Sequence, residues 1–541
     1  MNKINPIIKT ILNNKGIINE TDIDEFLSFK PQKTYDPFLL LNMEAGVDLI
    51  LKSIKDNECI CIYGDYDADG ITSISILIKI LKELNANVFY YIPSRFNEGY
   101  GLNNQAIEKV AEKGADLLIT VDCGTASIDE VEYAKNLGLK VIITDHHSVR
   151  DVKPNCLLIN PKQEDCSYPF KGLAGCGVAF KLAQALQKKA NLPKDVINEV
   201  LDIVAIGTIG DIVPLVDENR TIAKYGLWSI NKNKRDSIIE LTNQISKNRE
   251  NINSEYISYG IVPHLNAAGR MDNASIGVEF FLSNNKDNTK KIVNELVFQN
   301  NQRKKIQNDT YRNCMKLIKE QCEDSLFPII YAKDAHEGIT GIVAGKLKEE
   351  LNKPIAIVTP FGEYLKGTSR SVDGIDLYAL LKKAEKYFVQ FGGHKGACGF
   401  KLKKDNLEDL RNLLNNEINL YDEKLFKKNI CGDFVVSIDE LTLELAKSLE
   451  MLEPYGCENE KPTFEVRDID VSMLKTIGEE NNHLSFNAAN LRCIYFNFDE
   501  TSINLETTYK ATIIGKLNIN RFRNVDNVQF IVEHMEAIDE N

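Results

Sequence analysis

The sequence predicts an α/β protein that consists of a parallel-sheet domain, a second α/β domain joined to it by a long helix, and a C-terminal β-barrel. Three observations predict this fold class. Short β-branched apolar runs alternate with segments of helical periodicity, both in the first half of the chain and after Pro328. Residues 285–324 contain neither Gly nor Pro, which predicts one long helix between these blocks. Strand-like runs follow one another near the end, as in a small barrel.

The first block is predicted to contain a parallel sheet that is buried on both faces. The runs 59–63, 116–121 and 140–144 are short and β-branched and show no alternation, which is typical of such strands. Apolar residues recur at helical spacing over 71–84 and 127–137, which are the expected crossover helices. Right-handed crossovers place the carboxyl ends of these strands on one edge of the sheet. We expect a further strand at 157–160 and helices at 177–189 and 194–206.

Periodicity and turn residues divide the chain further. The second block should have strands at 328–332 and 354–358 and helices at 342–351 and 377–387, and the tail should have strands at 464–471, 491–498, 509–517 and 527–535. The expected parts are a helical N-terminal lead-in (1–55), the first α/β domain (56–230), a connecting region that contains NAAGR (231–284), the long linking helix (285–325), the second α/β domain (326–427) and the β-rich domain (428–541).

Composition limits the class of protein. With 541 residues the chain is too long for one core, and 43% apolar and 26% charged residues are ordinary for a globular protein. The twelve cysteines form no CxxC pair, which favours reduced thiols in the cytosol. The N-terminal stretch lacks the apolar core of a signal peptide, and we expect a cytoplasmic protein that does not enter a membrane. The net charge of -13 argues against non-specific coating of a polyanion but allows a local basic groove.

Carboxylates and histidines follow directly after three of the predicted strands, in GDYDADG (64–70), TVDCG (120–124) and TDHH (144–147). In open α/β sheets, ligands bind beyond the carboxyl ends of the strands, so we expect these side chains to converge there on a cation. The alternating acids of GDYDADG should lie on one side of an extended turn; a calcium loop of the EF-hand type is excluded because no Glu occupies the twelfth position. The converging residues are Asp65, Asp67, Asp69, Asp122, Asp145, His146 and His147.

Other interpretations of single residues remain open. Asp122 could instead cap the helix that starts near Ser127, which is the commoner role of such a residue. Asp211, in the apolar stretch TIGDIVPL, needs a cation, a hydrogen-bond donor or water if it is buried.

Oxygen-rich ligands with one or two imidazoles favour Mn²⁺ or Mg²⁺ over Zn²⁺, and there are enough acids for two ions that share a carboxylate. Such a pair activates water and stabilises a phosphoryl transition state. The chain has no Walker motif and no GxSxG elbow.

An ordered set of motifs between residues 59 and 400 resembles the motifs of the DHH phosphoesterases. Within that superfamily, the set is most similar to that of the RecJ single-strand exonucleases. The motifs are GDYDADG, VDCGT, DHH, GDIVPL, NAAGRM, HEGITGIVAGKL, TSRS and GGHKGACG. PYGCENEKPTF (454–464) and the β-rich tail after it are similar to the oligonucleotide-binding (OB) region of this family. The resemblance implies a DHH catalytic domain at 56–230, a DHH-associated substrate-binding domain at 326–427 and an OB-like nucleic-acid-binding domain at 428–541.

The resemblance also implies roles for individual residues. Two Mn²⁺ or Mg²⁺ ions would be held with Asp122 as the bridge, while Asp65 and His147 lie beside them and His147 contacts the scissile phosphate or the leaving group. The implied metal and catalytic residues are Asp65, Asp67, Asp69, Asp122, His146, His147 and Asp211. The residues implied to bind substrate phosphates, including the 5′ end, are Arg95, Arg270, Arg370, Ser371, Gly392, Gly393 and His394.

Physical chemistry agrees with these phosphate contacts, because arginine forks pair with phosphate oxygens and glycine permits a close approach of the backbone. The alternatives are a surface ion pair for Arg370 and a tight turn before a strand for GGHKGACG. His336 could bind substrate or cap the helix that begins near Thr340. Three departures from the family pattern affect the phosphate pocket and no metal ligand. They are Cys398 for an alanine, His264 for an arginine, and TSRS for a more glycine-rich version.

The resemblance implies a two-metal exonuclease that degrades single-stranded DNA in the 5′ to 3′ direction and releases 5′ mononucleotides in recombination and repair. It would act as a monomer beside a helicase and a single-strand-binding protein, with the strand in a cleft between the two α/β blocks. Arg521, Phe522 and Arg523 in the tail would guide the strand. A phosphodiesterase for very short RNA or cyclic dinucleotides would lack the residues after Lys428, and a decayed scaffold would have lost its carboxylates, all of which are present.

Overall fold

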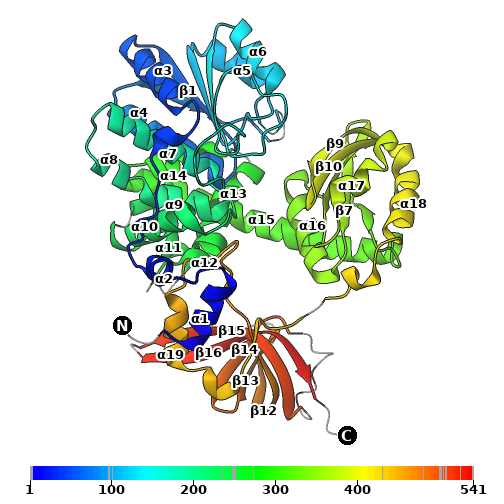
Figure 1. Ribbon diagram of the computed structural model, residues 1–541. Coiled ribbons are helices and arrows are strands. Elements are labelled where there is room, and N and C mark those ends of the chain that lie inside the picture. The colour runs from blue at the N-terminus through cyan, green and yellow to red at the C-terminus, as the bar shows by residue number, and fades with distance from the viewer. Residues whose placement is uncertain are drawn as a thin grey trace. The chain divides into compact units, whose positions relative to one another are not determined.

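The computed structural model describes residues 4–538, apart from 96, 97, 100, 234, 247–250, 272, 429, 479, 480, 499–502, 504, 506, 507 and 524. The chain forms two compact units. Unit 1 consists of Met1–Asn266, Ala274–Val293 and Ile430–Asn541, and unit 2 consists of Ala267–Asn273 and Asn294–Asn429. The α/β class with a C-terminal barrel is confirmed (Figure 1).

The first sheet, in unit 1, is fully parallel, with the strand order β2-β1-β3-β4-β5. The predicted strands at 59–63, 116–121, 140–144 and 157–160 are confirmed, whereas the half-buried strand β2 was not predicted, although it contains the apolar run Val88–Ile92. The strands are β1 (Cys59–Gly64), β2 (Asn87–Tyr91), β3 (Leu117–Val121), β4 (Lys140–Thr144) and β5 (Leu157–Ile159).

Helices cover both faces of this sheet. One face packs Cys61, Leu118 and Ile143 against Ile107 and Val131 of two crossover helices. On the other side, α4, which is buried except near its C-terminal end, packs against α7 and α9. The helix expected at 194–206 is two helices, α8 and α9, and α9 continues to Gly210. These helices are α3 (Met43–Lys55), α4 (Ala68–Glu83), α5 (Asn104–Glu112), α6 (Ile128–Asn136), α7 (Gly175–Lys189), α8 (Asp195–Asn198) and α9 (Leu201–Gly210).

Unit 1 also contains the N-terminal helices and the C-terminal barrel. The N-terminal helices α1 (Pro6–Asn14) and α2 (Glu20–Leu27) share an apolar core with the C-terminal barrel, through residues such as Leu12 and Ile23 packed with Leu445 and Phe464. The described residues of the connecting region 231–284 are mainly helical, and Ala267–Asn273 within this region belong to unit 2. The helices of this region, with the one before them, are α10 (Asp217–Asn233), α11 (Asp236–Ile245), α12 (Ser254–Tyr256), the π-helical turn η2 (Ile257–Ile261), α13 (Val262–Met271) and α14 (Ser275–Leu282).

Unit 2 contains a mixed sheet with the strand order β6-β7-β8-β10-β9. The expected long helix is α15 (Lys286–Gln321), one continuous helix of 36 residues. GGHKGACG forms the end of β9, a turn and the start of β10, so it lies in an antiparallel hairpin. The other elements are β6 (Ile329–Tyr331), α16 (Glu337–Leu351), β7 (Ile355–Phe361), β8 (Tyr364–Arg370), α17 (Leu377–Lys382), β9 (Phe388–His394), β10 (Ala397–Lys403) and α18 (Leu407–Ile418).

The C-terminal part of unit 1 is a closed five-stranded barrel. β12 pairs with β13 on one side and with β15 on the other, which closes the order β12-β13-β14-β16-β15. Four of its strands were predicted and β13 was not. The elements are β11 (Phe434–Val435), α19 (Leu443–Glu450), β12 (Phe464–Ile477), β13 (His483–Ala488), β14 (Leu491–Tyr495), β15 (Lys510–Phe522) and β16 (Val525–Ala537). Within the described residues, none of the helices has the length and apolar character needed to cross a membrane.

Candidate metal centre and phosphate-binding residues

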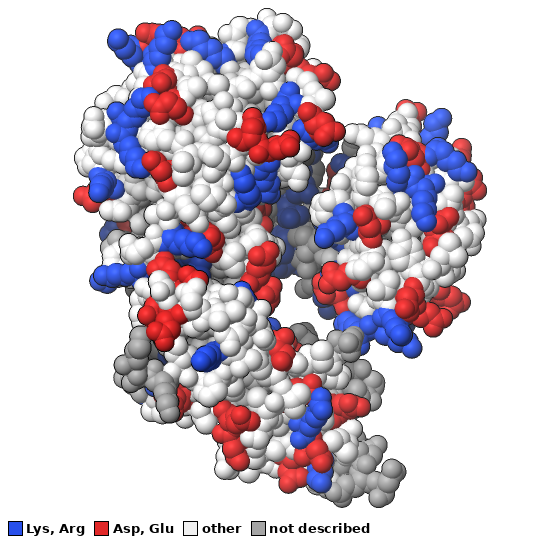
Figure 2. All heavy atoms as spheres, viewed as in Figure 1, with Lys and Arg blue, Asp and Glu red and all other residues white. Residues whose placement is uncertain are grey.

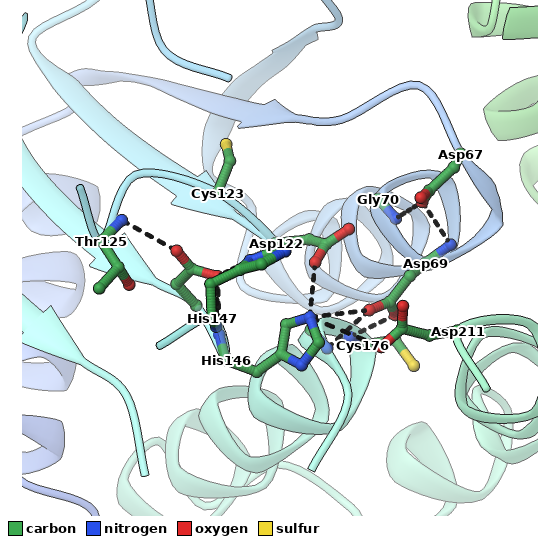
Figure 3. Close-up of polar contacts among 12 residues, drawn as sticks. Asp67, Asp69, Gly70, Asp122, Cys123, Thr125, His146, His147, Cys176 and Asp211 are labelled. Atoms are coloured by element: carbon green, nitrogen blue, oxygen red, sulfur yellow. Dashed lines mark hydrogen bonds and ion pairs between the residues drawn. The ribbon is translucent and has the colours of Figure 1, made fainter. Parts of the chain in front are cut away.

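The carboxyl edge of the parallel sheet brings the acids and histidines of the DHH block together, as Figure 3 shows. Asp65 and Asp67 follow β1, Asp122 follows β3, and His146 follows β4. Asp211 joins them from the C-terminal end of α9, where it occupies the C-cap position. Because parallel strands end at one edge, residues far apart in the sequence meet in one small region.

The GDYDADG turn places its acids in two directions. Asp67 is the N-cap of α4, and its Oδ1 accepts hydrogen bonds from the backbone N–H groups of Asp69 (3.0 Å) and Gly70 (3.1 Å). A Cβ on Gly70 would lie 2.4 Å from the carbonyl oxygen of Asp65, so only glycine fits this turn. The expectation that the three acids lie on one side of an extended turn is wrong. Helix α4 begins at Ala68, so Asp69 lies in its first helical turn, with its carboxylate against the N-terminus of α7.

Asp69 is fully buried and is held by the N-terminus of α7. Its carboxylate accepts hydrogen bonds from the backbone N–H groups of Gly175 (2.7 Å) and Cys176 (2.8 Å). Burial raises the pKa of Asp69 above its usual range, although these amides act in the opposite direction. A Cβ on Gly175 would come within 2.6 Å of the Asp122 side chain. Glycine therefore lets a helix terminus approach two carboxylates at once, a feature that the motifs did not reveal.

Asp122 has a left-handed backbone conformation, with φ of 58°. Such a conformation costs energy in a residue other than glycine and is often found at functional sites. The Asp122 N–H donates to the carbonyl of Thr144, which fixes the loop after β3 to the neighbouring strand. The alternative that Asp122 caps a helix is wrong, since the N-cap position of α6 is Ser127. Burial and the nearby carboxylates raise the pKa of Asp122 well above its usual range.

His146 lies among three carboxylates. Its Nε2 is 3.2 Å from Asp122 Oδ1, 3.5 Å from Asp211 Oδ2 and 3.9 Å from Asp69 Oδ2 (Figure 3). Burial, followed by the charge of His147, lowers the pKa of His146 to about 4. The imidazole is therefore neutral near pH 7, which is the form that binds a metal ion.

His147 is oriented by the first residue of its own motif. Asp145 Oδ1 lies 2.7 Å from His147 Nδ1 and also accepts from the backbone N–H groups of His146 and His147, while its Oδ2 accepts from the N–H of Thr125. Burial lowers the pKa of His147, but the hydrogen bond and charge of Asp145 outweigh it, so the net shift is upward. Asp145 thus serves to orient His147, a role that the sequence prediction of converging ligands did not separate from metal binding.

The donor set fits divalent cations. In each of three groups, the ligand atoms lie within 4.8 Å of one another. The groups are Asp65, Asp67 and Asp122; Asp69, His146 and Asp211; and Asp122, Asp145, His146 and His147. Among the described atoms, Asp65 Oδ1 is buried without a hydrogen-bond partner. Burial, with the charges of Asp69 and Asp67, raises the pKa of Asp211 to about 9. Carboxylates packed this closely repel one another, and oxygen-rich sites of this kind suit Mn²⁺ or Mg²⁺.

Arg95 is the predicted phosphate ligand that lies in unit 1. It follows β2, and its guanidinium carbon is 5.0 Å from the centroid of the Tyr66 ring. Its charge also acts on Asp65, where it opposes the effect of burial on the pKa. The structure therefore brings Arg95 to the metal centre, at the β2 side of the sheet.

The other predicted phosphate ligands lie in unit 2. Arg270 donates to the carbonyl of Gly338 (3.1 Å), and Arg370 donates to the carbonyl of Ser369 (2.9 Å). The Ser371 hydroxyl points inward and donates to the carbonyl of Ile375. The remaining candidates share the exposed edge strand β9 and are Gly392, Gly393 and His394.

The other residues that the sequence singled out are His336, His264 and the barrel residues Arg521, Phe522 and Arg523. His336 occupies the N-cap position of α16, but its side chain caps no helix amide. His264 is buried, with Nδ1 2.6 Å from the carbonyl oxygen of Gly260. In the barrel, Arg521 donates to both carboxylate oxygens of Glu450, whereas Arg523 is exposed. The side chain of Phe522 lies outside the described part of the chain.

Family models match three parts of the chain. The DHH family N-terminal domain matches residues 59–208, the DHHA1 domain matches 326–420 and the RecJ OB domain matches 432–534. The fold and the strand-end acids thus define a DHH-type hydrolase with an associated domain and an OB domain.

Relatives narrow this class. The chain is 35% identical to the single-stranded-DNA-specific exonuclease RecJ of Bacillus subtilis, over 98% of this chain and 68% of the relative. It is 31% identical to the single-stranded-DNA-specific exonuclease RecJ of Haemophilus influenzae, over 99% of this chain and 97% of the relative. The structure of Thermus thermophilus RecJ in complex with Mn²⁺ matches with a TM-score of 0.83 and 25% identity, over 98% of this chain and 75% of that one. The chain belongs to the RecJ family.

Proposed function

We propose that this chain is a metal-dependent exonuclease that hydrolyses the phosphodiester bonds of single-stranded DNA. The observation that carries the proposal is the cluster of Asp69, Asp122, His146 and Asp211 at the carboxyl edge of the sheet. These groups would hold two Mn²⁺ or Mg²⁺ ions, with Asp65 and Asp67 completing the set and Asp122 as the bridge. Ions bound there supply an activated water and neutralise charge on the scissile phosphate.

The residues around the ions have separate tasks. Asp69 is fixed by the α7 amides and Asp145 fixes His147, so the ligands keep their positions while a substrate enters. His147, oriented by Asp145, would contact the scissile phosphate or the leaving oxygen. A preorganised hydrogen-bond donor at that point stabilises the charge that develops during hydrolysis.

Substrate binding would use a limited number of placed cations. On the face that Figure 2 shows, Lys and Arg are interspersed with Asp and Glu, in agreement with the net charge of -13. Arg95, Arg270 and Arg370 would bind the phosphates of the strand, and the exposed glycines of β9 would allow its 5′ end to approach the backbone. In the OB domain Arg523 would contact the strand, and Arg521 would do so after release from Glu450.

Membership in the family supports a proposal for the direction of cleavage and for the cellular setting. We expect degradation from 5′ to 3′ with release of 5′ mononucleotides, in DNA recombination and repair in the cytoplasm. The chain would act as a monomer beside a helicase and a single-strand-binding protein. The relatives named as single-stranded-DNA-specific exonucleases support this substrate.

The test uses one oligonucleotide labelled at its 5′ or its 3′ end, in single-stranded and duplex form, with Mn²⁺. We expect early release of a labelled mononucleotide from the 5′-labelled single strand, and late release from the 3′-labelled one. The duplex should remain intact. Early release from the 3′ label would refute the direction, and equal hydrolysis of duplex and single strand would refute the substrate.

A further inference from the structure

The strand order of the parallel sheet leaves one side of the metal centre without an assigned cation. Along the carboxyl edge, Arg95 follows the outer strand β2, the acids and histidines follow the inner strands, and β5 is the other outer strand. The segment after β5 begins with Asn160, Pro161 and Lys162. Asp145 N–H donates to the carbonyl of Ile159, so this segment starts directly beside the DHH triplet.

Asn160 fixes the backbone of this segment to the metal centre. It is fully buried, and its side-chain N–H groups donate to the carbonyl oxygen of His147 (2.9 Å) and to the hydroxyl of Thr125 (3.0 Å). Its Oδ1 accepts from the backbone N–H of Lys162 (2.9 Å). One side-chain amide thus joins Lys162 to His147 and, through Thr125, to the loop that holds Asp145.

The Lys162 side chain is exposed, and among the described residues its ammonium group forms no ion pair or hydrogen bond. Burial dominates the pKa values of Asp211, His146 and His147, and the charge of Lys162 is among those that lower all three. Its charge therefore acts on the metal centre from the β5 side. An exposed cation whose backbone is fixed at the centre is suited to bind an anionic substrate group.

We propose that Lys162 binds a phosphate of the single strand next to the scissile one, on the side of the metal centre opposite Arg95. The two outer strands of the sheet would then each supply one cation, and the strand would be held at both sides of the ions. The inference rests on the proposed function and adds a substrate contact that the recognised motifs do not contain. A contact with a neighbouring phosphate stabilises the bound substrate and the transition state equally, so it should affect KM and leave kcat nearly unchanged.

The experiment compares wild type with Lys162→Gln and Lys162→Arg, using a single-stranded oligonucleotide and Mn²⁺ at several salt concentrations. Lys113→Gln is the matched control, since Lys113 is an exposed lysine before β3, at the opposite edge of the same sheet. For Lys162→Gln we expect KM to rise about tenfold, with kcat within about twofold of wild type. The slope of log(kcat/KM) against log salt should fall by about 0.7, the value for one phosphate contact on a single strand.

Lys162→Arg should restore KM and the slope, and Lys113→Gln should match wild type in both. An unchanged KM and salt slope in Lys162→Gln would overturn the inference, and so would a loss of kcat alone. The apparent Mn²⁺ affinity of each variant, measured from the thermal midpoint at increasing Mn²⁺ concentrations, should equal that of wild type, because Lys162 is not a metal ligand. If wild type itself does not hydrolyse single strands, the proposed function fails before the variants are compared.

Discussion

Asp145 and His147, two residues apart, form a 2.7 Å hydrogen bond between a buried carboxylate and an imidazole that is half exposed. The bond selects the ring orientation and raises the pKa of His147. Such partners of site histidines typically change activity by about 10–100-fold when they are lost. We expect Asp145→Asn to lower turnover by about that factor and to move the His147 titration to lower pH.

Histidine NMR titrations and kcat measurements check this prediction. Asp165→Asn is a suitable control because Asp165 is an exposed acid paired with Lys153 on the same domain. The role of Asp145 would have to be abandoned if the His147 pKa and kcat of Asp145→Asn equalled those of the control.

Without metal, the raised pKa of Asp211 should make folding stability depend on pH. Its pKa is about 9 in the folded protein and 3.8 ordinarily, so between these values the folded state holds a proton that the unfolded state has released. Stability contributed by this group is therefore full below about pH 4 and is lost as pH rises toward 9. In EDTA, we expect the thermal midpoint of wild type to fall relative to that of Asp211→Asn as the pH rises from about 6 to about 8.5. This interval covers about half of the pH range between the two pKa values.

Mn²⁺ should reverse this trend, because binding displaces the proton and the apparent affinity then increases with pH. Thermal unfolding at several Mn²⁺ concentrations and pH values measures both effects. Parallel midpoint curves for wild type and Asp211→Asn in EDTA would show that Asp211 does not carry the raised pKa.

The absence of a side chain at Gly175 should be essential for the site. In Gly175→Ala the new methyl group would lie 2.6 Å from Asp122, and either α7 or Asp122 would have to move. We expect at least about a tenfold loss of Mn²⁺ affinity, since a ligand and the amides on Asp69 are displaced together. Isothermal titration with Mn²⁺ provides the measurement.

Gly345→Ala is the matched control for this substitution. Gly345 lies inside α16 with open space around it, so alanine should raise stability by about 1 kcal/mol and leave Mn²⁺ affinity unchanged. Equal Mn²⁺ affinities for Gly175→Ala and wild type would contradict the close approach of α7 to Asp122.

A buried ion pair should make a large contribution to the stability of unit 1. Lys181 Nζ lies 2.8 Å from Glu218 Oε1, and both side chains are 1% exposed. Glu218 also accepts from Thr34 and from the backbone N–H of Tyr35, which anchors the N-terminal segment. Lys181→Met would leave a buried carboxylate without its cation, and we expect a loss of about 3–5 kcal/mol.

Urea unfolding gives the free energies, and Lys188→Met on the same helix is the control. Lys188 forms an exposed pair with Asp36, so its replacement should cost less than about 1 kcal/mol. Similar losses for the two variants would mean that the Lys181 pair is not effectively buried.

The sequence predicted those parts of the fold whose signal is local. Buried parallel strands such as β3 are continuous apolar runs, and α15 has neither Gly nor Pro. The strand β13 lacks such a run and was missed, whereas the half-buried strand β2 was missed although Val88–Ile92 form one. The core shared by α1, α2 and the barrel joins the two ends of the chain, and periodicity contains no information about contacts at that distance.

The candidate site was predictable in its residues but only partly in its geometry. The motifs named Asp69 and Asp122, and strand-end topology explained why they meet. The α7 amides on Asp69, the left-handed backbone of Asp122 and the amide of Asn160 depend on packing between distant segments. These features became visible only in three dimensions.

Counting bound Mn²⁺ by native mass spectrometry is the most direct test of the metal centre. Wild type should bind two ions per chain, and Asp122→Asn should lose both at the same free Mn²⁺ concentration. Asparagine tolerates the left-handed backbone of Asp122 and removes only the charge. Two ions in wild type and none in Asp122→Asn is the predicted result; no bound ion in wild type, or two in both proteins, would contradict the account.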